Sequence, residues 1–148
     1  MSEIIIHASD LKCPCVSQVK IFSTHWPNGA NLTLANIRRA AALKLDLYWF
    51  AQRFLTATAR AAYQRALDPA WEAYERDMAP STEAYVQAAR TEPYGRDTAT
   101  ALAAMEQAHV TVLAAYQHAQ AAALWEQIKR GGMKKHLRSL PCLSPPRR

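Results

Sequence analysis

Hydrophobic positions between residues 33 and 55 recur at helical spacing. In residues 34–44 (LANIRRAAALK) apolar side chains repeat every three or four positions on one face, which predicts an amphipathic helix with Thr33 as its N-cap. Residues 47–55 (LYWFAQRFL) follow the capping residue Asp46 and repeat the pattern. The consecutive aromatic residues of this second helix must point in different directions. We therefore predict that it forms the heart of the core.

The N-terminal residues alternate between strand-like and helical patterns. Residues 3–7 (EIIIH) form a β-branched run that is typical of a strand, and residues 31–34 (NLTL) are its candidate partner. Residues 15–23 have the spacing of a short helix. We predict an N-terminal helical subdomain over residues 1–56, in which the pattern also allows a short two-stranded element.

An 11-residue repeat organises residues 61–88. Tyr63, Tyr74 and Tyr85 recur at this interval, and so do Pro69 and Pro80. Eleven residues make about three helical turns, so the tyrosines are expected on one side of a helix. An interior proline costs a helix about 3 kcal/mol or more, and Asp68-Pro69 is also typical of a helix start. We therefore predict a kinked or broken long helix over residues 57–90.

A second long helix is predicted at residues 98–130. Residues 91–97 (TEPYGRD) form a loop with Asp97 as the next N-cap, and Gly131-Gly132 ends the helix. Its apolar stripe consists of Leu102, Met105, His109, Val112, Tyr116, Ala119 and Ala123. The sequence thus predicts one mainly all-α domain, residues 1–130, in which a long antiparallel helical hairpin packs on the N-terminal subdomain.

The positive charge is concentrated near the C-terminus. The chain has a net charge of +6, yet only basic residues occur from Lys129 onward: Lys129, Arg130, Lys134, Lys135, Arg138, Arg147 and Arg148. The preceding 128 residues carry 11 basic and 12 acidic side chains. Residues 131–148 are therefore predicted to be a basic, proline-containing tail. Such a tail binds nucleic acid, an anionic membrane or an acidic protein, or serves only to solubilise the chain.

Cellular location follows from what the chain lacks. No stretch approaches the roughly 20 apolar residues of a membrane span, and the acidic N-terminus does not resemble a signal peptide. Three cysteines do not form a disulfide framework. We expect a soluble protein of the cytoplasm that does not bind membranes.

Candidate metal ligands are few. Cys13-Pro14-Cys15 with His7 and His25 has the right residue types, but structural zinc usually takes four ligands, commonly from CxxC pairs, and Cys142 is remote. Reduced cysteines beside a small core are the favoured interpretation. No metal and no cofactor is predicted.

Catalytic chemistry is not indicated either. His109 and His118 lie nine residues apart on one helix and cannot chelate the same ion, and His109 is expected in the core or at an interface. The carboxylates Glu72, Glu75, Asp77 and Glu83 are typical of a solvated helix face. With no glycine-rich phosphate loop, a non-catalytic protein is predicted.

Two interpretations of the tyrosine row remain open. The tyrosines either pack between the two long helices or form an exposed aromatic row that meets a partner. The candidate partner-binding residues are Tyr63, Trp71, Tyr74, Tyr85, Lys134, Lys135 and Arg138.

Several short motifs point to a family. Residues 15–22 have the order C-x-x-Q-V-x-x-F, residues 26–29 have W-P-x-G, and residues 69–76 have P-A-W-x-x-Y-E-R. In these motifs the chain resembles, over residues 4–89, small phage- and prophage-encoded proteins of undefined function. It departs from them in its few repeats and its basic tail. The resemblance implies an accessory protein of a mobile element and assigns no activity to any residue.

Three functions are compatible with these observations. The first is binding of a host-cell protein, with inhibition of a bacterial defence system as a specific case. The second is nucleic-acid binding through the basic tail. The third is a helical scaffold that assembles with copies of itself.

Overall fold

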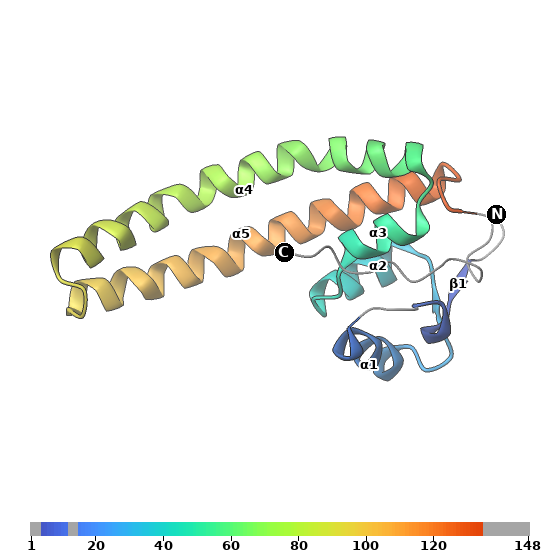
Figure 1. Cartoon of the computed structure of the whole chain (residues 1–148), viewed down its shortest axis with the longest axis horizontal. Coiled ribbons are helices and arrows are strands. Elements are labelled where there is room, and N and C mark those ends of the chain that lie inside the picture. The colour runs from blue at the N-terminus through green and yellow to red at the C-terminus, as the bar shows by residue number, and fades with distance from the viewer. Residues whose placement is uncertain (1–3, 12–14, 135–148) are drawn as a thin grey trace.

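Two long helices dominate the computed structural model, which describes residues 4–11 and 15–134 (Figure 1). As predicted, the protein is all-α with one small two-stranded sheet. Its elements are β1 (Ile5–Ile6), η1 (Ala8–Asp10), α1 (Val16–His25), β2 (Ala30–Asn31), α2 (Leu34–Ala42), α3 (Leu47–Phe54), α4 (Ala57–Thr91) and α5 (Arg96–Lys129).

The short sheet joins two segments on either side of α1. Strands β1 and β2 pair antiparallel, with Ile5 opposite Asn31 and Ile6 opposite Ala30. Strand β1 is shorter than its predicted segment, and β2 overlaps the predicted residues 31–34 only at Asn31. Ile6 and Ala30 are both buried. The sheet therefore fastens the N-terminal segment to the start of α2.

Local capping sets the starts of α2 and α3, as the sequence predicts. The Asn36 N–H donates to Thr33 Oγ1 at 3.2 Å, and the Trp49 N–H donates to Asp46 Oδ1 at 2.8 Å. Helix α2 ends at Ala42, two residues before its predicted end, because Lys44 adopts a left-handed backbone with φ 59°. This turn reverses the chain into α3.

Helix α4 is continuous through both prolines, so of the two predicted forms, a kinked or a broken long helix, the broken one is excluded. It curves along its length (Figure 1). Each proline lacks an N–H and leaves one carbonyl without its helical donor, at Arg65 and Arg76. Those positions and both prolines are exposed, so water can satisfy the carbonyls. Asp68 consequently lies inside the helix and does not start a new one.

Helix α5 begins two residues earlier than predicted. Its N-cap is Gly95, and Asp97 lies in the first turn, where its negative charge favours the positive end of the helix dipole. At the other end Gly131 has φ 74°; its N–H donates to the Ile128 carbonyl and the Gly132 N–H donates to the Gln127 carbonyl. These bonds form a Schellman motif, which confirms the predicted stop.

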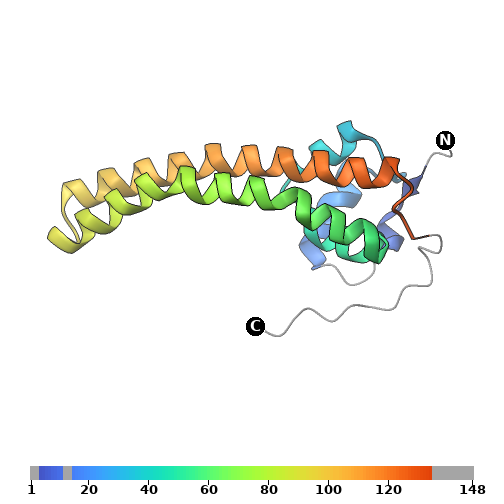
Figure 2. The same ribbon diagram turned by 90° about the horizontal axis from the view of Figure 1, so that it is seen from above.

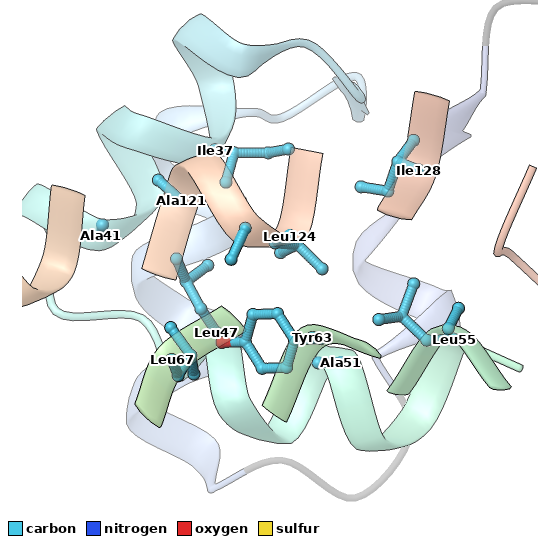
Figure 3. Packing of buried hydrophobic residues seen from close by; sticks show 12 residues of the cluster. Ile37, Ala41, Leu47, Ala51, Leu55, Tyr63, Leu67, Ala121, Leu124 and Ile128 are labelled. Atoms are coloured by element: carbon cyan, nitrogen blue, oxygen red, sulfur yellow. The ribbon is translucent and has the colours of Figure 1, made fainter. Parts of the chain in front are cut away.

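The main core lies where α3 and the proximal ends of α4 and α5 meet α2. Figure 3 shows Tyr63 of α4 in the middle of this cluster, between Leu47 of α3 and Leu124 of α5. A second cluster, under the sheet and α1, contains Phe22, Trp26 and the fully buried Phe54 of α3. Helix α3 contributes to both clusters, which confirms its predicted central place.

The molecule divides into a body and an arm (Figures 1 and 2). We define the arm as residues 68–120, the distal parts of α4 and α5 with their connecting loop. The body comprises the other described residues. Toward its tip the arm extends well away from the N-terminal helices, whereas at its base α5 still borders the C-terminal end of α2.

Candidate interaction surface

The arm has almost no buried side chains. Thr98 is the one buried residue of the arm, whereas the body contains all the other buried residues that the structure describes. Large apolar side chains of the arm remain exposed, including Trp71 at 47%, Val86 at 39% and Val110 at 64%. A two-helix layer cannot enclose its apolar residues, and exposed apolar surface of this kind is typical of an interaction site.

An aromatic cluster holds the two helices together at the base of the arm. Trp71 stacks on Tyr74 with ring centroids 5.1 Å apart, and both contact Tyr116 of α5 at 5.7 Å and 6.0 Å. His109 meets the edge of Tyr74 at 6.2 Å. Such aromatic pairs are worth about 0.5–1.5 kcal/mol beyond burial, so the cluster fixes one face of Trp71 and leaves the other open.

The structure separates the three tyrosines of the repeat. Tyr63 is fully buried, which corrects its prediction as a partner contact. Its hydroxyl has no hydrogen-bond partner among the described residues, and burial raises the pKa of this phenol. Tyr74 and Tyr85 are only half-buried, because the main core cluster extends along α4 no further than Leu67. The row therefore packs inward in the body and becomes partly accessible in the arm.

One side of α4 in the arm presents a shallow apolar surface with acidic margins, which we call the α4 face. Trp71, Met78 and Val86 supply its large apolar side chains, and Glu75 and Glu83 supply carboxylates. The remaining residues of the face are Tyr74, Ala79, Thr82, Gln87 and Arg90. Trp71, one of the predicted partner contacts, is 47% exposed on this face.

A groove of about 310 Å³ lies between the C-terminal end of α2 and the middle of α5. We call it the α2–α5 groove. Its floor is apolar and its cationic groups are Arg38 and Lys44, with His118 at the same site. The remaining lining residues are Ala41, Ala42, Val110, Leu113, Ala114 and Gln117. The prediction did not include this groove, because its two sides are about 70 residues apart in the sequence.

Charge is divided between the two parts of the molecule. The arm carries the acids Asp68, Glu72, Glu75, Asp77, Glu83, Glu92, Asp97 and Glu106 against the bases Arg76, Arg90 and Arg96. The described body carries the bases Lys20, Arg38, Arg39, Lys44, Arg53, Arg60, Arg65, Lys129, Arg130 and Lys134 against the acids Asp10, Asp46 and Glu126. The near-neutral sequence before the tail therefore folds into an acidic arm on a basic body.

The histidines and cysteines do not come together as a site. Within residues 4–11 and 15–134 no group of three potential metal ligands is present, and Cys13 and Cys142 lie outside these ranges. Cys15 is exposed, and its pKa is lowered, chiefly by a hydrogen bond with the Ser17 hydroxyl. His109 is exposed and therefore lies outside the core, but its ring meets Tyr74 of α4, which agrees with the interface position that the prediction also allowed. His118 lines the α2–α5 groove.

A small apolar cavity of about 80 Å³ lies in the body between the sheet, α1, α2 and α3. The polar side chains beside this cavity form hydrogen bonds with other parts of the protein. The Trp26 indole N–H donates to Asn36 Oδ1 at 3.3 Å, and Gln18 accepts from the Asp46 N–H at 2.9 Å and donates to the Lys44 carbonyl at 3.2 Å. These bonds serve the fold by tying α1 to the turn between α2 and α3, and the residue after α1 to α2 itself.

The start of the basic tail is fixed on the body. The Lys134 N–H donates to the Phe54 carbonyl at 2.9 Å, and its ammonium donates to the Arg53 carbonyl at 2.7 Å. Burial lowers the pKa of Lys134, with the nearby Arg60 and Arg53 charges acting in the same direction. Lys134 therefore has a structural role, whereas Lys135 and Arg138 lie outside the described residues.

Comparison of the chain with protein-family models, curated proteins and solved structures finds no match. In the part of the chain that the structure describes, every helix is too short or too polar to cross a bilayer. The class of protein is therefore described from the fold and its surfaces alone. It is a small all-α protein whose helical hairpin arm presents an unpartnered apolar face.

Proposed function

We propose that this chain is a non-catalytic protein that binds another protein through the α4 face of its arm. The observation that carries the proposal is the burial pattern: the arm spans 53 residues, contains one buried residue and exposes Trp71, Val86 and Val110. Aromatic anchors beside half-buried neighbours are typical of binding hot spots. Trp71 fits this description because Tyr74 and Tyr116 hold its ring in place.

The energetics favour occupation of the α4 face. Removing apolar surface from water stabilises a complex by roughly 25 cal/mol per Å², and a rigid surface loses little side-chain entropy on binding. The α4 face lies on one regular helix, so it is ordered before a partner arrives. The resemblance to phage-encoded proteins supports a host protein as partner, and inhibition of a bacterial defence system is the specific form that we propose.

Site-specific photo-crosslinking in bacterial cells tests this proposal. We expect a photoreactive phenylalanine analogue at Thr82, an exposed position of the α4 face, to give a discrete crosslinked product. The matched control is the same analogue at Ala104, which is exposed on α5 and lines neither the α4 face nor the α2–α5 groove. Equal products at both positions, or none at Thr82, would contradict the proposal.

Nucleic-acid binding is the second candidate, and the basic character of the body favours it. Exposed Lys20, Arg38 and Arg39 lie in the body, away from the acidic arm. Phosphate contacts make affinity fall steeply with salt. A fluorescence titration of DNA and RNA with the full chain tests this candidate, and salt-independent or undetectable binding would remove it.

A further inference from the structure

The α2–α5 groove has the chemistry of a receptor for an acidic apolar helix. Val110 is 64% exposed on its floor, and Leu113 extends the apolar strip by one helical turn. Arg38 and Lys44 have no ion-pair partner among the described residues, and no acidic side chain is among those that line the groove. An occupant that buries the floor and supplies carboxylates would satisfy both features.

The backbone of Lys44 indicates that its position is specific. Its φ of 59° lies in the left-handed region, which glycine adopts freely and a side chain adopts with strain. Hydrogen bonds to Gln18 hold this turn, because the Lys44 carbonyl and the Asp46 N–H both bond to that amide. The chain thus has a lysine at the edge of the groove where glycine would fit the turn better. Strain of this kind is a pointer to function.

The α4 face offers the complementary chemistry on the same molecule. Glu75 and Glu83 flank Met78, and neither carboxylate has an ion-pair partner among the described residues. Eight residues separate these two glutamates, a length of about 12 Å at 1.5 Å per residue. The groove runs along α5 from Val110 to His118, which is the same eight-residue interval. The face and the groove are therefore both apolar and carry opposite charges, and the face's glutamates span a length similar to that of the groove's α5 side.

We propose that two copies of this chain associate, with the α4 face of each copy seated in the α2–α5 groove of the other. This inference rests on the proposed function, because it takes the α4 face as the docking surface; it assigns a second copy of the chain, in place of a host protein, as the occupant of that face. In a two-fold arrangement the same contact forms twice, and the assembly stops at two copies. The carboxylates Glu75 and Glu83 would pair with Arg38 and Lys44 across each contact, while Trp71, Met78 and Val86 cover the floor.

Charge reversal with complementation tests this pairing. One variant carries Arg38→Glu and Lys44→Glu, and a second carries Glu75→Lys and Glu83→Lys. We expect wild type to be dimeric by light scattering during size exclusion, and each variant alone to be monomeric because both of its contacts become repulsive. An equimolar mixture of the two variants is expected to restore the dimer, since each contact then joins opposite charges.

Two control variants test whether charge reversal outside the α4 face and the α2–α5 groove also disrupts the dimer. Lys20→Glu changes an exposed charge of the body, and Glu106→Lys changes an exposed charge of the arm one helical turn before Val110; neither residue lines the face or the groove. Both are expected to remain dimeric. A wild type that is monomeric at about 100 µM, variants that remain dimeric alone, or a mixture that stays monomeric would each overturn the pairing.

Lys44→Gly adds a readout that a purely structural lysine would not give. Relief of the left-handed strain is expected to raise the Tm, while loss of the ammonium weakens association about tenfold or more. A raised Tm with unchanged association would contradict the role of Lys44.

Failure of this inference is distinguishable from failure of the proposed function. A monomeric wild type that still gives the Thr82 crosslink to a different protein overturns the second copy and leaves the α4 face as a docking surface. Absence of both the dimer and the crosslink overturns both.

Discussion

Replacement of Phe54 by alanine is expected to lower the free energy of unfolding by about 3–5 kcal/mol. Phe54 is fully buried at the point where the two core clusters meet. Its ring packs against Phe50 at 4.5 Å and meets the edge of Trp49 at 6.0 Å. Alanine would leave a cavity between the sheet, α1 and α3 that the surrounding backbone cannot close. Urea unfolding followed by tryptophan fluorescence measures the loss.

Tyr48→Ala on the same helix is the control for this substitution. Tyr48 is 47% exposed, so its truncation removes a similar ring from the surface of α3 and is expected to cost about 0.5 kcal/mol or less. If Phe54→Ala and Tyr48→Ala unfold at the same urea concentration, α3 does not hold the core together.

Removal of the outer arm is expected to leave the body folded. A variant that lacks residues 76–109, with Glu75 joined to Val110 by a short glycine-containing turn, loses one buried residue, Thr98. Because stability comes chiefly from buried apolar surface, its free energy of unfolding should stay within about 1 kcal/mol of wild type. The far-ultraviolet circular dichroism should fall in proportion to the helical residues removed.

The outcome also separates two roles for the arm. An arm that exists to present a surface can be removed without unfolding the body, whereas an arm that completes the core cannot. Loss of cooperative unfolding in the shortened chain would show that the arm stabilises the body, against the burial pattern of the structure.

Elements governed by local chemistry could be predicted from the sequence. The caps at Thr33 and Asp46 depend on one side chain and a backbone N–H three residues away, so short-range rules suffice. The glycine stop after α5 is local for the same reason. The sequence left open whether two prolines kink or break α4, because their cost depends on whether water reaches the freed carbonyls, and exposure is a property of the folded chain.

The interaction surfaces could be predicted only in part. Spacing alone places Tyr63, Tyr74 and Tyr85 on one side of α4, yet their depth differs because α2 and α3 cover only the proximal end. The α2–α5 groove joins Lys44 to His118, residues that no local pattern connects. The division of charge could have been predicted from the sequence. When the charged residues are counted helix by helix, the acids fall on the long hairpin and the bases on the N-terminal helices.

The affinity of the purified chain for the protein that crosslinks at Thr82, whether a second copy or a host protein, tests the central claim most directly. We expect Trp71→Ala to weaken this binding about 30-fold, because a hot-spot aromatic residue contributes about 2 kcal/mol or more. Tyr94→Ala, which removes a fully exposed aromatic ring from the loop at the end of the arm, should leave the affinity unchanged. Equal affinity of wild type and Trp71→Ala would contradict the assignment of the α4 face as the docking surface.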